Sequence, residues 1–401
     1  MSSSNPESIP IIPADPDAHL TAVAKFVSDE FAGGQYVDEI ARKYYVECHF
    51  DWSASRLAFD GDELVHHWGV WGYPMRLGSI ALQAAGVGAV VTREPYRNRG
   101  LMHRAALASF DAMRANGYDV SILRGRHYHK YGYRRAWNYD TWRVNEEDIQ
   151  RSENPVRTRT LGPDQMDQIV ELYNQTYAGL SGTAVRPTYP MLEEGEMDAH
   201  GWFDENDRLA GYVRASKSEA DSSLRCLEAA GDPDIGLAAL ADMFRQGEYE
   251  SLTFFTFPRL HPILQRARVG MVKLESQYFY HTGWQVKLVN LRSALTKMEP
   301  LLTERLGRSR FNSWEGRLEL VGGEERAGLA CRSGTVAIEA YDPVGENKID
   351  AGQALGRLLI GSDDPDEVMR QERIVCRGWG EALASVLFPN MRPMMSHWDE
   401  Y

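Results

Sequence analysis

The chain has 401 residues, of which 43% are hydrophobic and 25% are charged, a globular balance that excludes a wholly disordered protein and is long enough for two or three domains. The formal net charge of −13 argues against general nucleic-acid binding and favours a cationic partner. No stretch approaches the roughly 18 to 20 apolar residues of a membrane span, the amino terminus lacks a secretion-signal pattern, and four separated cysteines show no metal-ligand spacing, so we expect a cytoplasmic protein with free thiols and no metal.

The amino-terminal segments predict two helices followed by a β-hairpin. Apolar residues recur at helical spacing over residues 18–31 and again over residues 37–46. Strand-like alternation then covers residues 56–71 and is interrupted by Asp60-Gly61-Asp62. Because glycine tolerates the positive φ of a tight turn, this interruption predicts a hairpin.

The next segments complete a mixed α/β unit. A strand over residues 79–91 contains Gly86 and Gly88, which leave room for a bulge or for the close approach of a ligand. Residues 101–116 have the pattern of an amphipathic helix that ends at a glycine, and residues 119–123 follow as a strand. This order of helices and strands is typical of a mixed α/β domain.

The segment RNRGLM, Arg97 to Met102, lies between that strand and that helix and predicts an anion-binding loop. Backbone N–H groups at a helix start share a partial positive charge, and Gly100 lets a phosphate approach where a Cβ would obstruct it. Arg97 and Arg99 can add charge-assisted contacts. A surface helix with an arginine-rich first turn is the alternative interpretation.

A basic region surrounds this loop in an otherwise acidic chain. Residues 81–143 contain eleven Lys and Arg residues against four Asp and Glu residues. An anionic cofactor such as coenzyme A explains a region of this kind, and a solvated basic face is the alternative.

The segment YHKYGY, Tyr128 to Tyr133, is interpreted as a strand edge that carries a phenol. A phenol with a pKa near ~10 is protonated at neutral pH and can give its proton to a leaving group within hydrogen-bond reach. Tyr128 is the candidate donor, and a tyrosine packed in a hairpin is the alternative. Strand alternation would place His127 and His129 on the opposite face, so neither is expected to take part.

A second α/β unit is expected after the polar link at residues 145–155. Strand-like residues 156–161, helix-like residues 162–179 and a hairpin over residues 202–216 repeat the opening order of the first unit. The stretch 236–246 has no loop equivalent to RNRGLM. We therefore expect a duplication whose second copy has lost the anion site.

A third pattern begins beyond about residue 290. A helix over residues 291–306 precedes three strands over residues 314–323, 326–334 and 335–342, with glycine turns between them, and helices follow. The last residues, 387–401, are apolar and aromatic almost to the end, whereas chain ends are usually polar and frayed. We expect this tail to be docked against the protein.

The order of strand, loop, helix and strand over residues 85–136 resembles the GNAT acyltransferase superfamily. RNRGLM matches the family's pyrophosphate loop, R/Q-x-x-G-x-G/A, except at Met102, and His127 to Tyr133 is similar to its F-Y-x-K-x-G-F signature. The resemblance implies that Tyr128 is the general acid that protonates the departing thiolate of acetyl-CoA. It also implies a splayed strand that binds the pantetheine arm through its backbone. The coenzyme-binding residues that it implies are Ala89, Val90, Val91, Arg97, Asn98, Arg99, Gly100, Leu101 and Met102.

Two GNAT-like halves and a smaller last domain make the whole chain similar to the enhanced intracellular survival (Eis-like) family. This similarity implies an α/β fold with mixed sheets: a catalytic GNAT domain at 1–145, a second GNAT-like domain without the coenzyme loop at 146–290, and a sterol-carrier-like domain at 291–401. It implies that the α-carboxylate of Tyr401 enters the first domain's site as the general base. It also implies a homo-oligomer, with a hexamer as the expected assembly.

The predicted function is transfer of the acetyl group of acetyl-CoA, a co-substrate, to a primary amine of a cationic small molecule or of a lysine. We expect no metal, nucleic-acid or membrane partner. An α-carboxylate with a pKa near ~3.5 is a weak base for an ammonium near ~10, so a water relay or desolvation has to help. The alternatives are a non-catalytic acyl-CoA-binding or scaffold protein and a lipid-binding protein that acts through the last domain.

Histidines and aromatic residues outside these motifs have plainer interpretations. His66, His67 and His103 lack a carboxylate partner and metal-ligand spacing, so structural roles are expected. Several aromatic residues suit either an acceptor pocket or the core, and the core is the commoner place for them. They are Trp68, Trp71, Tyr44, Tyr45 and Trp398.

Overall fold

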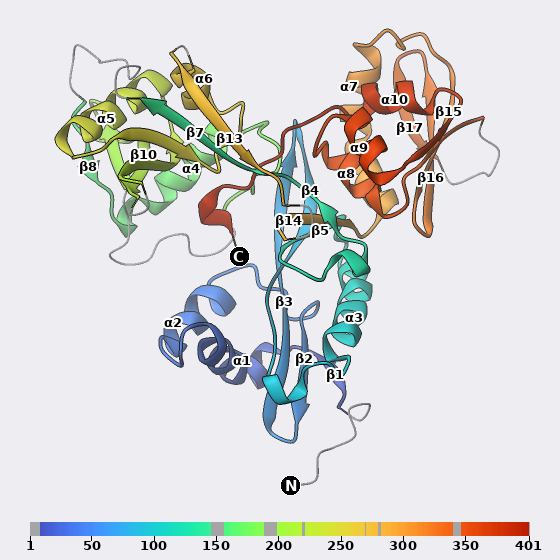
Figure 1. The fold of residues 1–401 in the computed structure, drawn as a ribbon, viewed down its shortest axis with the longest axis horizontal. Helices are drawn as coiled ribbons and strands as arrows, with labels where there is room; N and C mark the ends of the chain where they lie inside the picture. The colour runs from blue at the N-terminus through green and yellow to red at the C-terminus, as the bar shows by residue number, and fades with distance from the viewer. Residues whose placement is uncertain are drawn as a thin grey trace.

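The computed structural model describes residues 9–145, 156–187, 199–218, 221–268, 270–279, 282–339 and 346–400. Within these ranges the chain forms three β-sheets, two of seven strands and one of five (Figure 1). The first sheet lies at the centre of the view, with the second and third units on either side of one of its ends. The predicted mixed α/β class is confirmed, since the sheets contain parallel and antiparallel pairs covered by helices.

The first sheet has the strand order β1-β2-β3-β4-β5-β14-β6. Its strands are β1 (Ile11–Pro13), β2 (Arg56–Asp60), β3 (Glu63–Leu77), β4 (Ile80–Thr92), β5 (Val120–Arg124), β6 (Arg134–Arg135) and β14 (Trp284–Leu288). Helix α1 (Pro16–Phe31), helix α2 (Val37–Ala41) and the π-helical turn Arg42–Val46 pack on one face. Helix α3 (Leu101–Ala115) packs on the other face and connects β4 to β5, the parallel pair of this sheet (Figure 1).

Local sequence explains where these elements begin and turn. Helix α1 starts after Asp15, whose carboxylate accepts hydrogen bonds from the backbone N–H groups of Asp17 and Ala18. The hairpin predicted at Gly61 is confirmed, because β2 and β3 pair across it and Gly61 has a φ of +61°. Helix α3 buries one apolar stripe against β3 and β4, as its periodicity predicts.

The second sheet has the strand order β13-β7-β12-β11-β10-β9-β8. Its strands are β7 (Tyr139–Asn145), β8 (Arg159–Thr160), β9 (Ala199–Phe203), β10 (Leu209–Lys217), β11 (Ser223–Ala230), β12 (Ser251–Phe255) and β13 (Val272–Gln277). Its helices are α4 (Met166–Thr176), α5 (Pro233–Gln246) and α6 (Pro262–Ala267). Strands β11 and β12 are parallel and are joined by α5, which repeats the layout of β4, α3 and β5 and supports a duplication.

The first two sheets exchange strands. Strand β7 lies inside the range predicted for the first domain, yet it pairs with β12 and β13 of the second sheet. Strand β14 lies inside the range predicted for the second domain, yet it pairs with β5 and β6 of the first. Alternation predicts the buried face of a strand but not its partner, because partners bond through backbone groups. The sheets therefore do not divide at the predicted limits of 1–145 and 146–290, and those domain ranges stay a prediction.

The third sheet has the strand order β17-β16-β15-β18-β19. Its strands are β15 (Gly316–Gly322), β16 (Glu325–Arg332), β17 (Thr335–Glu339), β18 (Asn347–Asp350) and β19 (Val375–Arg377). Its helices are α7 (Leu291–Gly307), α8 (Leu355–Ile360), α9 (Pro365–Glu372) and α10 (Gly380–Leu387). One hydrophobic cluster joins this unit to the first sheet, since Met75 and Leu82 pack in it together with Leu295 and Leu355.

Short 3-10 helices complete the described elements. They cover Glu94–Tyr96, His129–Tyr131, Pro163–Gln165, Gly352–Ala354 and His397–Asp399. In the part of the chain described above, no helix combines the length and apolar character needed to cross a bilayer.

The tail that follows α10 leaves the third unit and runs to the second (Figure 1). Trp398 is 8% exposed and packs in a cluster with Leu161, Ile169 and Tyr212 of the second unit. The predicted docking of the tail is thus confirmed as far as Glu400. Tyr401 lies outside the described residues.

Candidate active site

Strand β4 continues beyond the end of its pairing with β5, at one end of the first sheet. The two strands pair in parallel from Ala84 with Val120 to Val87 with Leu123, and β4 then continues to Thr92. The pairing of β4 with β3 shifts by a bulge in the same region, opposite His67. Beyond this pairing, backbone groups of β4 face a gap beside β5, where an extended ligand can bind them.

A cavity of about 600 Å³ lies at this gap. Its walls come from the end of β4, the loop before α3 with the first turn of that helix, and the turn after β5. The lining residues are Val90, Val91, Thr92, Tyr96, Arg97, Asn98, Arg99, Gly100, Leu101, Met102, His103, Arg126, His127, Tyr128, Lys130 and Tyr131. The structure thus brings together Tyr128 and every predicted coenzyme residue except Ala89, which lies next to the lining in sequence.

The start of helix α3 is open toward an anion. Gly100 is the N-cap residue with a φ of +74°, and no side chain caps the first turn. A Cβ built at Gly100 would meet no atom of the described chain within 4 Å. The helix start therefore offers N–H groups and a positive dipole end to a ligand rather than to its own chain.

Cationic side chains add to this field. Arg97 donates through Nε to the carbonyl oxygen of Thr92 at 3.1 Å, and the Arg99 guanidinium lies 5.2 Å from the centre of the Tyr96 ring. Arg126 and Lys130 come from the opposite wall, and no carboxylate is among the described lining residues. A cavity of this charge fits the pyrophosphate of a coenzyme.

Tyr128 does not lie on a strand, and the strand predicted over Tyr128 to Tyr133 is wrong. The chain turns there and forms the 3-10 helix His129–Tyr131, with φ values of +74° at His127 and +90° at Gly132. Positive φ is incompatible with an extended strand, and a glycine makes it accessible. The alternation that excluded His127 and His129 therefore does not apply, and His127 lines the cavity.

The Tyr128 ring is held by packing. It contacts the rings of Trp68 and Tyr133 edge-on, with centroids 6.1 Å away in both cases. Gly125 makes room for it, because a Cβ there would lie 3.0 Å from Tyr128 Cε2. Burial raises the pKa of Tyr128 to about 12, so the hydroxyl keeps its proton at neutral pH.

His66 and His67, on strand β3, are buried, as expected of structural residues. Their hydrogen-bond partners lie on β4, next to the bulge. His66 Nδ1 lies 2.7 Å from Thr92 Oγ1, and His67 Nδ1 lies 2.8 Å from the carbonyl oxygen of Ala89. Burial lowers the pKa of His66 to about 3 and that of His67 to about 4, so both rings are neutral. A carbonyl accepts only, so Nδ1 of His67 carries the ring proton and donates it to Ala89.

Ala89 has a φ of +47°, which a residue with a Cβ rarely adopts. The His67 hydrogen bond therefore holds the strand in a shape that it would not favour alone. The sequence offered no signal for this role, because two histidines in a strand suggest core positions and the two partners are 22 residues apart.

The aromatic residues considered for an acceptor pocket are outside the lining of this cavity, although the Trp68 ring packs against Tyr128. Trp68, Trp71, Tyr45 and Trp398 are buried in hydrophobic clusters, Tyr44 is 38% exposed, and none of them lines the cavity.

The second unit differs at the helix start that corresponds to α3. Helix α5 begins after Asp232, whose Oδ1 accepts from the backbone N–H groups of Asp234 and Ile235 at 2.9 and 3.1 Å. A carboxylate of the protein thus occupies the position that an anionic ligand would need. This is a physical reason for the predicted absence of a coenzyme site in the second unit.

The docked tail contacts the end of strand β5. A carboxylate oxygen of Glu400 lies 3.5 Å from Nη1 of Arg124, the last residue of β5. The turn that carries Tyr128 follows directly from this strand. The placement of Tyr401 in the site is not tested by the described residues and stays a prediction.

Comparison with known proteins identifies the first unit. Residues 17–136 match the family model described as an acetyltransferase (GNAT) domain. Comparison with curated protein sequences finds no match. Residues 17–136 thus resemble an acetyltransferase domain, domains of this type generally bind acetyl-CoA, and the chain is an acyltransferase.

Solved structures resemble the whole chain. A GCN5-related N-acetyltransferase from Kribbella flavida has 18% sequence identity and a TM-score of 0.71, over 97% of this chain and 99% of that one. A probable N-acyltransferase from Enterococcus faecalis has 15% identity and a TM-score of 0.73, over 97% and 99%. Eis1 from Mycobacterium abscessus has 16% identity and a TM-score of 0.66, over 97% and 99%. At these identities the likeness shows a shared fold.

Proposed function

We propose that this acyltransferase moves the acetyl group of acetyl-CoA to a primary amine of a cationic acceptor. One observation carries the proposal: a cationic cavity joins an uncapped helix start, the end of strand β4 and a buried phenol. The pyrophosphate would bind the first N–H groups of α3 together with Arg97 and Arg99. The pantetheine arm would follow the backbone of Ala89, Val90 and Val91.

Acetyl transfer then needs an electrophile, a base and an acid. The amine nitrogen attacks the thioester carbonyl, and backbone N–H groups at the end of β4 polarise the carbonyl oxygen. The new C–N bond forms as the C–S bond breaks, and the electron pair of that bond leaves on sulfur. Tyr128 gives its proton to the sulfur, and the proton that the amine loses restores the phenol through the base and solvent.

The α-carboxylate of Tyr401 is the proposed base. The apolar docking of the tail and the contact of Glu400 with Arg124 at the end of β5 support it. A carboxylate with a pKa near ~3.5 is too weak to deprotonate an ammonium alone, so the proposal includes a bound water between them.

The acceptor and the biological setting belong to the proposal as well. The net charge of −13 favours a cationic acceptor, such as a polyamine, an aminoglycoside-like amine or a lysine. An Eis-like chain would carry a sterol-carrier-like fold in the third unit, act in the cytoplasm and assemble as a hexamer. The third unit, with its five-stranded sheet and helices α7 to α10, has a size and layout that suit such a module.

The decisive measurement is thiol release from acetyl-CoA against a panel of amines. Wild type is expected to release thiol with at least one cationic amine. Replacing Tyr128 by Phe is expected to lower kcat by about 100-fold, the typical contribution of a general acid. Removing Tyr401 is expected to cause a comparable loss, while acetyl-CoA binding measured by calorimetry stays close to wild type.

The matched control is Tyr249→Phe, which removes a hydroxyl from the second unit, remote from the cavity. Its activity should equal that of wild type. Full activity in Tyr128→Phe and in the truncated protein would contradict the mechanism. Binding of acetyl-CoA without turnover of any amine would favour a scaffold instead.

A further inference from the structure

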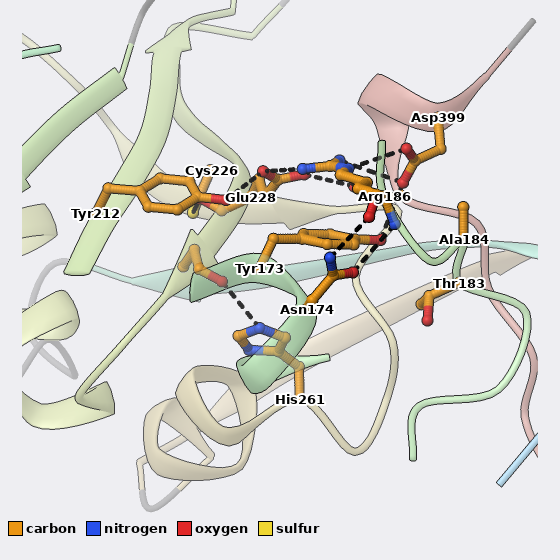
Figure 2. A network of polar contacts seen from close by, with 12 residues as sticks. Tyr173, Asn174, Thr183, Ala184, Arg186, Tyr212, Cys226, Glu228, His261 and Asp399 are labelled. Carbon is orange, nitrogen blue, oxygen red and sulfur yellow. Dashed lines mark hydrogen bonds and ion pairs between the residues drawn. The ribbon is translucent and has the colours of Figure 1, made fainter. Parts of the chain in front are cut away.

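A buried ion-pair network lies where the tail meets the second unit. The Arg186 side chain is fully buried and binds two carboxylates at once (Figure 2). Its Nη1 and Nη2 donate to the two oxygens of Glu228 at 2.9 and 2.6 Å. Its Nε and Nη2 donate to the two oxygens of Asp399 at 2.9 and 3.2 Å. The second carboxylate belongs to the tail, whereas the first lies on β11.

Hydroxyl groups donate further hydrogen bonds to both carboxylates. Tyr173 donates to Asp399 at 2.9 Å, Tyr212 donates to Glu228 at 2.6 Å, and Ser396 of the tail donates to Glu228 at 2.7 Å. The guanidinium of Arg186 also lies 3.5 Å from the centre of the Tyr173 ring. Buried charges that are paired and hydrogen-bonded in this way hold one geometry, because any displacement leaves a charge unsatisfied.

The segment that carries Arg186 is tied to the first sheet. The backbone of Arg76, on β3, exchanges hydrogen bonds with Thr183 O at 2.8 Å and with the N–H of Gly182 at 2.9 Å. Nη2 of Arg76 donates to Asn174 Oδ1 at 2.6 Å. Asn174 in turn bonds the backbone N–H and carbonyl of Arg186 at 3.0 and 2.8 Å (Figure 2).

The tail is therefore fixed to the catalytic sheet at two places. Through Arg186 and Asn174, Asp399 is connected to Arg76 on β3. Through the next residue, Glu400, the tail reaches Arg124 at the end of β5. Asp399 precedes Tyr401 by two residues, so chain length alone limits the distance between the Cα atoms of these two residues to about 7 Å.

We propose that Arg186 and Asp399 are positioning residues whose ion pair holds the tail so that the chain end can reach the acetyl-transfer site. This inference rests on the proposed function, in which the Tyr401 carboxylate is the base. A misplacement of about 1 Å can lower a rate by about 100-fold, so an anchor two residues away has kinetic consequences.

The test uses Asp399→Asn in the full-length protein, which keeps the shape of the side chain and removes its charge. We expect kcat to fall ten- to 100-fold, with the Kd for acetyl-CoA unchanged. Hydrogen exchange in peptides covering 388–400 should rise. The pH profile of kcat/KM should approach that of the protein without Tyr401, because both lack a correctly placed base.

Glu171→Gln is the matched control, because Glu171 lies on the same helix as Tyr173 and forms an exposed ion pair with Arg208 at 2.9 Å. It should match wild type in every readout. Arg186→Gln is the second variant and should lower kcat at least as much as Asp399→Asn, because it leaves both Glu228 and Asp399 without their charged partner.

The outcomes separate this inference from the function on which it rests. If removing Tyr401 abolishes transfer but Asp399→Asn keeps wild-type kcat and pH profile, the positioning role is overturned and the proposed function stands. If removal of Tyr401 leaves activity intact, the base assignment fails and the inference fails with it. If both variants lose kcat and share one pH profile, both are supported.

Discussion

His67 illustrates, at the scale of a single residue, how one side chain can set the shape of a binding strand. Its ring donates to the carbonyl of Ala89 at 2.8 Å, in a strand whose backbone φ turns positive at that residue. The residues that follow, Val90 and Val91, line the cavity. In the proposed site, the hydrogen bond therefore shapes the strand that would hold the coenzyme, without contact between His67 and the coenzyme.

Replacing His67 by Phe should weaken acetyl-CoA binding. The loss of one hydrogen bond is worth about 1 kcal/mol, which corresponds to about a five-fold rise in Kd if the bulge relaxes. Titration calorimetry measures it. His261→Phe is the control, since His261 is also buried and its Nε2 lies 3.0 Å from the carbonyl of Ala229 in the second unit. An equal Kd in both variants would contradict the role of His67.

At the scale of an element, helices α3 and α5 occupy equivalent positions in their sheets but differ at their first turns. Both connect parallel strands, yet α3 begins at a glycine without a side-chain cap and α5 begins at Asp232, whose carboxylate caps it. The sequence predicted that the second unit has no loop equivalent to RNRGLM, and the structure adds that Asp232 caps the corresponding helix.

Replacing Gly100 by Val should lower acetyl-CoA affinity by tenfold or more, because the side chain would enter space that the phosphates need. Gly117→Val is a close control at the other end of α3. Gly117 has a φ of +80°, compared with +74° at Gly100, and a Cβ meets no atom within 4 Å at either position. Both variants should lose similar stability in thermal unfolding, and affinity should fall only at Gly100. Unchanged binding would remove the phosphate-loop assignment.

At the scale of the whole molecule, the three units are connected to one another by shared packing and shared strands. The first and third units share a hydrophobic cluster, the first and second exchange β7 and β14, and the tail runs from the third unit to the second. Each link reaches the first sheet. We therefore expect the acetyltransferase domain to depend on the rest of the chain for its rigidity.

Stability of the whole molecule should depend on pH through its buried histidines. Burial lowers the pKa of His66 and His261 to about 3 and that of His67 to about 4, from 6.5. Below pH 6.5 the unfolded chain binds protons that the folded chain does not. The contribution of these histidines to the free energy of unfolding is therefore complete above pH 6.5 and is lost as pH falls to about 4 for His67 and to about 3 for His66 and His261. At about 1.4 kcal/mol for each unit by which the pKa is lowered, the full effect is about 3 kcal/mol for His67 and about 5 kcal/mol each for His66 and His261.

Urea unfolding followed by circular dichroism from pH 7 to pH 5 measures this effect. The free energy of unfolding should fall over that range, which lies above the titration of ordinary carboxyl groups. His67→Phe should show a smaller fall than wild type. A free energy that does not change with pH would contradict buried neutral histidines.

The sequence by itself determined the helices at the start of the chain, the hairpin at Gly61, the strand and helix on either side of the loop from Arg97 to Met102, and the loop itself. These are local features, since hydrophobic period, capping and glycine act within a few residues. The resemblance drawn from them placed Tyr128 in the cavity region, although its turn was predicted as a strand.

Only the tertiary structure decided which elements meet. The insertion of β14 between β5 and β6, the contact of His67 with Ala89, and the pairing of Arg186 with Asp399 across 213 residues leave no local trace. Backbone hydrogen bonds are chemically alike in every strand, so they do not specify which strands pair. The partner of a buried charge depends on which segments the fold brings together. The sequence therefore determined the local elements that form the site, and long-range packing determined their positions relative to one another.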